Sequence, residues 1–319
     1  RNNAKVGWHT VVLTGIHPLA PGLIMPEKIP KINTVIDTPS RIGECPVWSA
    51  AEQALYWVDI LEPAIHRLEF ATGARTHWRM PSAIGSFGLR EQGGAVVALR
   101  TGFHLFDFAT GSLQFLLDPE AEQTENRFND GKVSPDGRFF AGTMHDVPDR
   151  QPVAALYRLD PDGSCHKVLD HLHVSNGLAW SPDGKILYHS DSRAAIIQAF
   201  DYDSTSGAIS KPRLLATVAN ETGRPDGAAT DVEGYYWSAG VSAGVLNRWS
   251  PDGKLAAQIP MPCTAPTMPC FGGPDMKTLF VTSLTDGQPA AALAAKPLSG
   301  CLFSLDVDVP GVPIARFKG

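Results

Sequence analysis

Short apolar runs alternate with tight polar turns along most of the chain. A representative copy is the turn Ser134–Gly137, which is followed by the apolar run Arg138–Met144. The same turn and run recur at Ser181–Gly184 and, in looser form, at four other places. The Gly, Asp and Pro residues of these turns supply the backbone conformations that hairpins need. The pattern therefore predicts short β-strands joined by hairpins.

The turns recur with a regular period. Their first residues lie at positions 49, 90, 134, 181, 231 and 273, so that successive copies are 41 to 50 residues apart. A second family of six hairpins lies between them, at Leu68–Gly73, Phe106–Gly111, Leu159–Gly163, Phe200–Tyr202, Trp249–Gly253 and Leu305–Val307. Two hairpins per copy give four antiparallel strands, and such units of about 45 residues are typical of propeller blades. Because no change of composition divides the chain, we predict an all-β, six-bladed β-propeller rather than a β-sandwich or two smaller β domains.

A strand-like segment precedes the first full copy. Ile32–Asp37 alternates as a strand would, whereas the first copy begins near Gly43. We expect this segment to complete the last blade and close the ring without a free edge. Residues 31–319 are thus predicted to form the propeller, and residues 1–30 an N-terminal tail outside the repeat. Val11–Met25 is apolar but lacks a basic start and a small-residue cleavage site, so we do not interpret it as a signal peptide.

Composition narrows the class of protein. The net charge is −6, which argues against a nucleic-acid or anionic-membrane partner, since both favour a basic face. The sequence contains no run of 18 apolar residues, so no membrane-spanning helix is predicted. The five cysteines are scattered and lack CxxC spacing: Cys45, Cys165, Cys263, Cys270 and Cys301. We expect free thiols and a cytoplasmic location.

One position of the repeat carries polar side chains in most copies. Five residues before each turn stand Glu44, Gly85, Asn129, Asn176, Asp226 and Met268. Equivalent positions of a propeller's inner strands face one level of the central channel, so the four polar side chains should converge there. Neighbouring buried carboxylates are costly unless a positive charge lies between them. Oxygen donors of this kind suit Ca²⁺, Mg²⁺ or Mn²⁺, with Zn²⁺ also possible.

The two remaining ring positions bear on whether such a metal is accessible. Gly85 and Met268 carry no polar group and are expected to leave an open side for water or substrate. A catalytic metal needs such an incompletely filled coordination sphere. The residues alone leave two alternatives open, which are a closed ion site that only holds the blades together and a water-filled polar channel.

Several segments, most of them in the predicted inner strands, resemble the regucalcin/gluconolactonase family of sugar lactonases. They are Gly43–Trp48, Arg127–Lys132, Ala141–Met144, Ser175–Trp180, Pro225–Gly227 and Cys270–Gly273. The resemblance runs from about residue 34 to the C-terminus. It implies one divalent metal, such as calcium, zinc, manganese or iron, held by Glu44, Asn176 and Asp226. It also implies that Arg127 and Asn129 contact the substrate.

The same resemblance refines the expected substrate. Thr143–Asp146 is similar to the corresponding segment of bacterial pentonolactonase members. Val147 stands near the place of the acidic lid residue of the animal members, so their substrate preference is not expected to carry over. The function implied is metal-dependent hydrolysis of a five- or six-carbon sugar lactone to its aldonic acid, in sugar catabolism.

The chemistry of a lactone assigns roles to these residues. Opening a cyclic ester needs a polarised carbonyl, an attacking water and a stabilised oxyanion, all of which a metal can assist. Asp226 is the candidate general base, with a pure ligand role as the alternative. Arg127 and Asn129 would orient the sugar, although Arg127 could instead pair with an acid such as Glu125.

Strand direction adds two candidates. The second strand of each blade returns toward the site, and in the third blade it ends at His145 and Asp146. These two are predicted substrate contacts, or else an exposed loop pair. Two rival functions remain. A propeller esterase or organophosphate hydrolase would be favoured by a wider, more apolar mouth. A non-enzymatic calcium- or sugar-binding propeller would be favoured by a metal that protein ligands enclose fully.

Overall fold

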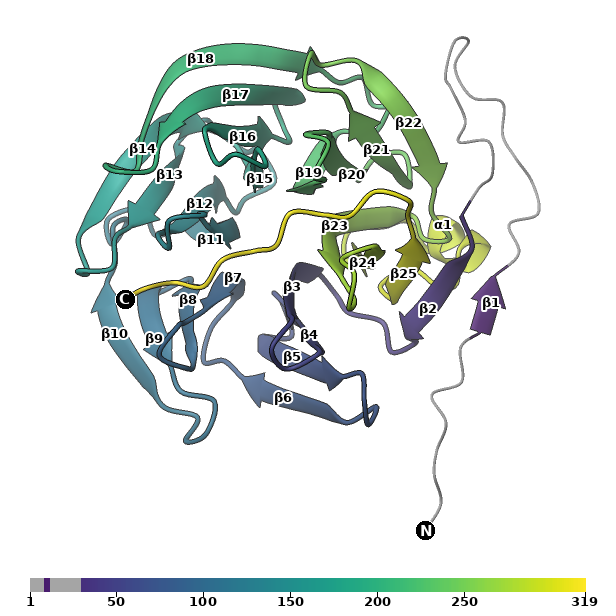
Figure 1. The fold of residues 1–319 in the computed structure, drawn as a ribbon, viewed down its shortest axis with the longest axis horizontal. Coiled ribbons are helices and arrows are strands. Elements are labelled where there is room, and N and C mark those ends of the chain that lie inside the picture. The colour runs from purple at the N-terminus through teal and green to yellow at the C-terminus, as the bar shows by residue number, and fades with distance from the viewer. Residues whose placement is uncertain (1–8, 12–29) are drawn as a thin grey trace.

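Six antiparallel sheets surround a central axis in the computed structural model, which describes residues 9–11 and 30–319 (Figure 1). Blade 1 comprises β3 (Gly43–Ser49), β4 (Ala54–Asp59), β5 (Ala64–Glu69) and β6 (Arg75–Arg79), and blade 2 comprises β7 (Ile84–Leu89), β8 (Ala95–Leu99), β9 (Gly102–Phe106) and β10 (Leu113–Leu117). Blade 3 comprises β11 (Asn126–Val133), β12 (Phe139–His145), β13 (Ala154–Leu159) and β14 (Cys165–Leu172), and blade 4 comprises β15 (Ser175–Trp180), β16 (Ile186–Asp191), β17 (Ile196–Asp203) and β18 (Ala208–Thr217). Blade 5 comprises β19 (Pro225–Thr230), β20 (Tyr236–Gly240), β21 (Val245–Trp249) and β22 (Leu255–Pro260). The predicted six-bladed propeller is confirmed.

Blade 6 joins the two ends of the chain. It comprises β23 (Ala265–Gly272), β24 (Thr278–Leu284), β25 (Leu302–Asp306) and β2 (Ile32–Ile36), and β1 (His9–Val11) pairs with the outer edge of β2. β2 lies antiparallel to β25, with Ile32 opposite Leu305. The expected ring closure by this early strand is therefore confirmed. Apart from β1 and residue 30, the predicted N-terminal tail lies outside the described residues.

The hairpins follow the repeat with two differences. Phe200–Tyr202 lies inside β17 rather than in a turn, because this strand continues to Asp203 before the chain reverses. Leu305–Val307 ends β25 without a hairpin, because β2 already occupies the next position in blade 6. The chain is therefore free to leave the sheet after β25.

The apolar core lies between neighbouring blades. The inner strands β3, β7, β11, β15, β19 and β23 are buried throughout, whereas outer strands such as β6 and β18 are mainly exposed. One cluster joins Tyr56 and Val58 of blade 1 to Phe87 and Val97 of blade 2. Burial of apolar surface between adjacent sheets thus fixes the blades around the axis.

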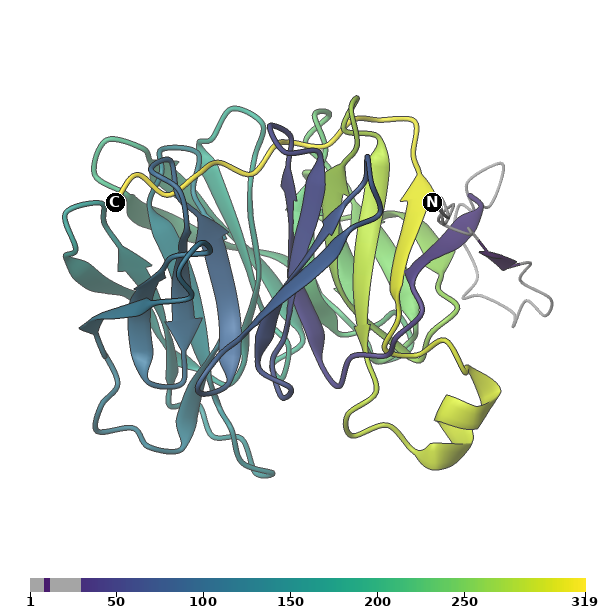
Figure 2. The same cartoon turned by 90° about the horizontal axis from the view of Figure 1, so that it is seen from below.

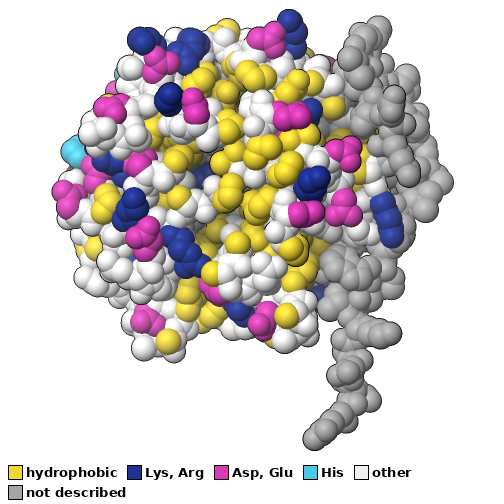
Figure 3. Space-filling view, viewed as in Figure 1, with side chains coloured by type: hydrophobic (Ala, Val, Ile, Leu, Met, Phe, Trp, Pro, Cys, Tyr) yellow, Lys and Arg dark blue, Asp and Glu magenta, His cyan; other side chains and the backbone are white. Residues whose placement is uncertain are grey.

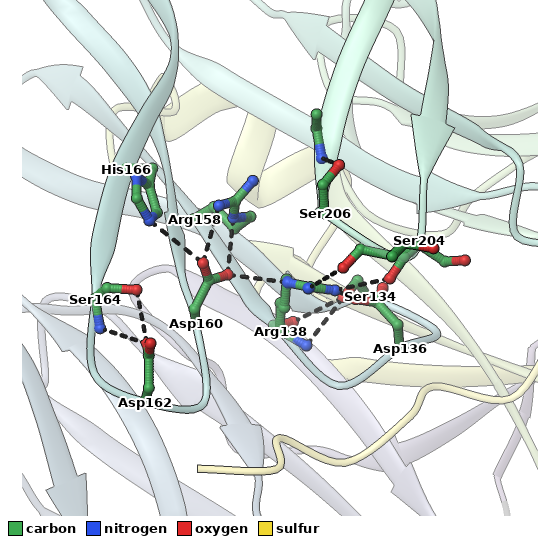
Figure 4. A network of polar contacts seen from close by, with 12 residues as sticks. Ser134, Asp136, Arg138, Arg158, Asp160, Asp162, Ser164, His166, Ser204 and Ser206 are labelled. Carbon is green, nitrogen blue, oxygen red and sulfur yellow. Dashed lines mark hydrogen bonds and ion pairs between the residues drawn. The ribbon is translucent and has the colours of Figure 1, made fainter.

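Polar contacts add to this packing at the rim of blades 3 and 4 (Figure 4). Arg138 forms ion pairs with Asp136 and, at 3.0 Å, with Asp160. The same guanidinium donates hydrogen bonds to the carbonyl oxygens of Ser204 and Thr205, in the β17–β18 turn of blade 4. Asp160 also binds Arg158 through both carboxylate oxygens, at 2.8 and 2.9 Å. One arginine therefore connects two blades.

Residues 310–319, here called the C-terminal strap, cross one face of the propeller, and α1 (Ala290–Ala295) lies at the opposite face (Figure 2). Backbone N–H groups of the strap donate to the Met276, Thr230, Leu89 and Gly137 carbonyl oxygens, in blades 6, 5, 2 and 3. Val312–Ala315 covers the end of the channel beside Lys132. Hydrophobic side chains gather over the middle of this face (Figure 3). All five cysteines are free, and among the described helices none is long and apolar enough to cross a membrane.

Candidate active site

Every inner strand carries a β-bulge at or beside the polar ring position predicted from the sequence. The pairing of β3 with β4 shifts between Glu44 and Val47, and that of β15 with β16 shifts between Asn176 and Ala179. Corresponding shifts occur in the other four inner strands. A bulge bends a strand and redirects its side chains, and bulges are frequent beside active sites. Here they interrupt the ladders at the end of the channel near the segment Asp286–Gln288, which leads into α1 at the face opposite the strap (Figure 2).

A cavity of about 220 Å³ lies at this end of the channel. Its walls include Glu44, Asn176 and Asp226, the three predicted metal ligands, together with Arg127 and Asn129. The fold thus brings the four polar ring positions of the sequence analysis, Glu44, Asn129, Asn176 and Asp226, from four blades to one cavity. A cavity of this size admits a small molecule rather than a polymer.

Two buried carboxyl groups dominate its electrostatics. Glu44 is 6% exposed and Asp226 is 8% exposed. Burial raises the pKa of Glu44 well above its ordinary value, and the neighbouring charge of Asp226 raises it further. Burial, followed by the charge of Asp130, raises the pKa of Asp226 to about 8. A positive charge between the two groups would therefore stabilise the ionised form of both.

A chain of amide hydrogen bonds orients Asn176. Asn129 donates from Nδ2 to Oδ1 of Asn176 at 2.8 Å. On its other side, Asn176 donates from Nδ2 to Ser192 Oγ at 2.7 Å, and this hydroxyl donates to the Pro225 carbonyl oxygen at 2.6 Å. Because the Ser192 proton is used on Pro225, the hydroxyl must accept from the amide nitrogen. The arrangement turns Oδ1 of Asn176 away from Ser192. This oxygen keeps a second lone pair with which it can bind a cation.

Asp130 lies deeper in the channel than the ring. It is 2% exposed, and its Oδ2 accepts a hydrogen bond from the Leu178 N–H at 3.1 Å, whereas Oδ1 has no partner among the described residues. Burial raises the pKa of Asp130, and the charge of Lys132 opposes this shift. Lys132 donates in turn to the carbonyl oxygen of Ala228. The channel below the cavity therefore contains a third carboxyl group with one compensating cation.

Arg127 is fixed by its neighbours rather than by Glu125. It donates to Oδ1 of Asn129 and to the Phe128 carbonyl oxygen, both at 3.0 Å. Its Nε lies 3.3 Å from Oδ1 of Asp146, which also pairs with Arg100. Arg127 therefore does pair with an acidic residue, as the alternative prediction allowed, but this residue is Asp146. Glu125 lies against His145 instead.

His145 and Asp146 lie beside the cavity but do not form its walls. His145 Nε2 lies 3.2 Å from Glu125, and its Nδ1 accepts a hydrogen bond from the Gln151 N–H. Asp146 reaches the site through Arg127. Their predicted contacts with substrate remain predictions.

The expected opening at Gly85 and Met268 is wrong. A Cβ placed on Gly85 would overlap the backbone of Phe128 and Asn129, because the inner strand of blade 3 fills that space. Met268 is fully buried and packs against Gly227. The cavity opens instead between loops that carry Arg150, Arg193, Arg224 and the segment Asp286–Gln288.

These loop residues were missed by the sequence reasoning. Ser192 and Arg193 directly follow β16, and Asp286 closely follows β24. Each stands at the end of the second strand of its blade, the position that drew attention to His145 in blade 3. The same rule, applied to all six blades, would have found Arg193 and Asp286, but not Arg150, which lies five residues beyond β12, or Arg224, which precedes β19.

The donor set fits a divalent metal. Glu44 and Asp226 supply carboxylate oxygens, and Asn176 supplies an oriented amide oxygen. Among the described residues, no group of three or more His, Cys, Asp or Glu lies at metal-binding spacing, so any such site here depends on the amide. Two buried carboxylates that repel one another, with an amide oxygen beside them, match the hard donors that Ca²⁺ and Mg²⁺ prefer.

Comparison with known proteins finds similar sequences over most of the chain. Residues 42–285 match the sequence profile of the SMP-30/Gluconolactonase/LRE-like region. The chain is 43% identical to a 6-deoxy-6-sulfogluconolactonase of Pseudomonas putida over 289 residues, which cover 90% of this chain and 99% of the relative. It is 37% identical to the regucalcin of Danio rerio over 292 residues, covering 91% and 99% of the two chains.

Among solved structures, the chain is similar to a calcium-binding protein, the regucalcin of Agrobacterium tumefaciens. The TM-score is 0.83 at 27% identity, and the match covers 89% of this chain and 96% of that one. Together with the sequence relatives, this likeness extends over the whole propeller.

Proposed function

Because the chain belongs to the SMP-30/gluconolactonase/LRE-like family, we propose that it uses a divalent metal to hydrolyse a sugar lactone to the aldonic acid. It is an enzyme of the lactonase class, a carboxylic ester hydrolase. The observation that carries the proposal is the meeting of Glu44, Asn176 and Asp226 with Arg127 and Asn129 in one small cavity. We propose a five- or six-carbon aldonolactone from sugar catabolism as the substrate.

The bound cation would supply a Lewis acid for the lactone carbonyl and lower the pKa of water. Glu44, Asn176 and Asp226 hold it in our proposal. Asp226 also accepts the proton of the attacking water, as a carboxylate that lies within reach of both the cation and the substrate can do. Asn129 and Arg127 hydrogen-bond the sugar hydroxyls, and Asp146 keeps the Arg127 guanidinium in place.

The walls of the cavity favour a polar substrate over the esters of the rival hypothesis. Arginine, carboxylate and amide side chains are the majority of its lining residues, and six apolar residues line the remainder together with Ser192. Charged groups at the opening of this cavity, among them Arg150 and Arg193, fit a polar sugar better than the hydrophobic ester that a wide apolar mouth would favour.

Proton release tests the proposal directly. The protein is treated with a chelator, reloaded with one metal at a time, and assayed on a panel of aldonolactones. We expect activity to vanish on chelation, return with at least one metal, and fall about 10²–10⁴-fold in Asp226→Asn. Asp183→Asn, an exposed turn residue far from the cavity, is the matched control and should keep full activity. A folded, metal-loaded protein with no rate above background on any lactone would exclude the proposal.

A further inference from the structure

Three arginines line the cavity without forming an ion pair within the described part of the chain. Arg150, Arg193 and Arg224 all contribute to its walls. Every ion pair within the described residues involves other side chains, and Nε of Arg224 is buried without a hydrogen-bond partner. They come from three successive blades, since Arg150 follows β12, Arg193 follows β16 and Arg224 precedes β19. The guanidinium groups therefore face one space from three directions.

These positive charges are close enough to influence one another. Burial lowers the pKa of Arg150, the charge of Asp146 opposes this, the charges of Arg193 and Arg224 lower it further, and the charge of Asp226 raises it. Gathering like charges at one opening costs free energy unless an anion offsets it. A fold that brings three unpaired guanidinium groups to one small cavity is thus complementary to an anion.

The other charged side chains of the cavity already have an ion-pair partner or a role in the proposed cation site. Asp146 pairs with Arg127 and Arg100, and Asp286 pairs with Arg41 at 2.6 Å. Glu44 and Asp226 are the carboxylates that our proposed function assigns to the cation. Once a divalent cation balances those two, the three arginines leave the cavity with a net positive charge.

On this basis, and resting on the proposed function, we infer that the substrate is a sugar lactone that carries a second, anionic group, held by Arg150, Arg193 and Arg224. The group is a sulfonate, a phosphate or a carboxylate, because guanidinium forks bind all three through paired N–H donors. Arg150 and Arg193 are exposed and Arg224 is half-buried. The anionic end of the sugar thus lies toward the mouth, and the lactone carbonyl lies deeper, beside Asp226.

Paired substrates test the inference. We would measure kcat/KM for glucono-lactone and for its 6-sulfonate and 6-phosphate counterparts, with a glucaro-lactone as the carboxylate arm. We expect at least one anionic lactone to exceed the neutral one by about tenfold or more, and the three arms identify the preferred anion. Arg150→Gln and Arg193→Gln should each reduce this ratio about tenfold, and added salt should reduce it as well. Arg75→Gln, an exposed arginine of β6 without an ion pair, should leave the ratio unchanged.

The outcomes separate this inference from the proposed function. If neutral and anionic lactones are hydrolysed with equal kcat/KM, the enzyme is a lactonase but the anion site is refuted. If no lactone is hydrolysed, calorimetry with 6-phosphogluconate and gluconate decides. Tighter binding of the phosphorylated acid that is lost in the Arg150→Gln/Arg193→Gln double variant would uphold the anion site alone, and equal binding would refute both.

Discussion

Ser192 shows how a residue outside the predicted donor set determines the chemistry of one inside it. Its hydroxyl donates to the Pro225 carbonyl oxygen and accepts from Nδ2 of Asn176, and Asn129 approaches the other end of the same amide. Asn176 therefore has one orientation in which every group is satisfied. Residues that orient a metal ligand in this way commonly change affinity when they are replaced.

We predict that Ser192→Ala weakens divalent-cation binding about ten- to hundredfold, because the amide of Asn176 loses the partner that orients it. Calorimetric titration of the chelator-treated protein with Ca²⁺ and Mn²⁺ measures the effect. Ser134→Ala also removes a buried hydroxyl, in this case near the strap, and should not change the affinity. Unaltered binding by Ser192→Ala would mean that Asn176 is not a ligand or needs no orienting group.

His189 predicts an acid sensitivity of the folded protein. It is fully buried, its Nε2 lies 2.9 Å from Ser175 Oγ, and burial lowers its pKa to about 4. The unfolded chain takes up a proton near pH 6.5 that the folded protein cannot accept until about pH 4. The free energy of unfolding therefore decreases as the pH falls through this window, by about 2 kcal/mol between pH 7 and pH 5.

Urea denaturation at the two pH values, for the wild type and His189→Gln, measures this contribution. The variant should lose about 2 kcal/mol less than the wild type on going from pH 7 to pH 5. The difference between the two proteins removes the effect of the other titrating groups. An identical loss in both proteins would show that His189 does not carry the linkage.

At the scale of the strand, the sequence predicted the blades but not the packing between their inner strands. The turns and apolar runs are local signals, so the six copies and the polar ring could be read from spacing alone. At Gly85 the missing side chain suggested empty space. The neighbouring strand β11 fills this space instead, since protein interiors are close-packed and the approach of two strands is a tertiary property.

We predict that Gly85→Ala lowers the free energy of unfolding by about 1–3 kcal/mol, because its Cβ would push β7 away from the Phe128 and Asn129 backbone. Since Asn129 belongs to the site, kcat/KM should fall as well. Thermal unfolding and a lactone assay at low temperature measure the two effects. Wild-type stability and activity would show that β11 can move aside without cost.

The strand-end loops explain what else sequence reasoning missed. His145 and Asp146 were selected because the second strand of blade 3 ends there, yet Arg193 and Asp286 occupy matching places in blades 4 and 6. Which of these residues reach the cavity depends on loop conformation. Arg150, for example, lies five residues beyond the end of β12 and still reaches the wall. No periodic pattern encodes such a path.

At the scale of the whole molecule, the C-terminal strap joins blades that are distant in sequence. Its Phe317 is 2% exposed and lies in the cluster shared by blades 2 and 3, and its backbone donates to Leu89. The strap and α1 lie at opposite faces (Figure 2), and the segment Asp286–Gln288, which lines the cavity, leads directly into α1. Stability and catalysis should therefore respond separately to changes in it.

We predict that Phe317→Ala lowers the free energy of unfolding by about 3–5 kcal/mol, the usual cost of truncating a buried phenylalanine. The lactone kcat/KM of the folded variant should remain that of the wild type. Phe115→Ala, which truncates a phenylalanine that is 58% exposed, should change stability by less than about 0.5 kcal/mol. Urea denaturation compares the three proteins, and a Phe317→Ala variant as stable as the wild type would exclude a stabilising role for the strap.

The closure of blade 6 by β2 has a consequence for synthesis on the ribosome. β2 emerges early, but its partner β25 is translated about 270 residues later. At about 5–20 residues per second, this delay is on the order of tens of seconds. During that time the first five blades can form in order of translation, while β2 waits with one edge unpaired. The ring can therefore close only after nearly the entire chain has been translated.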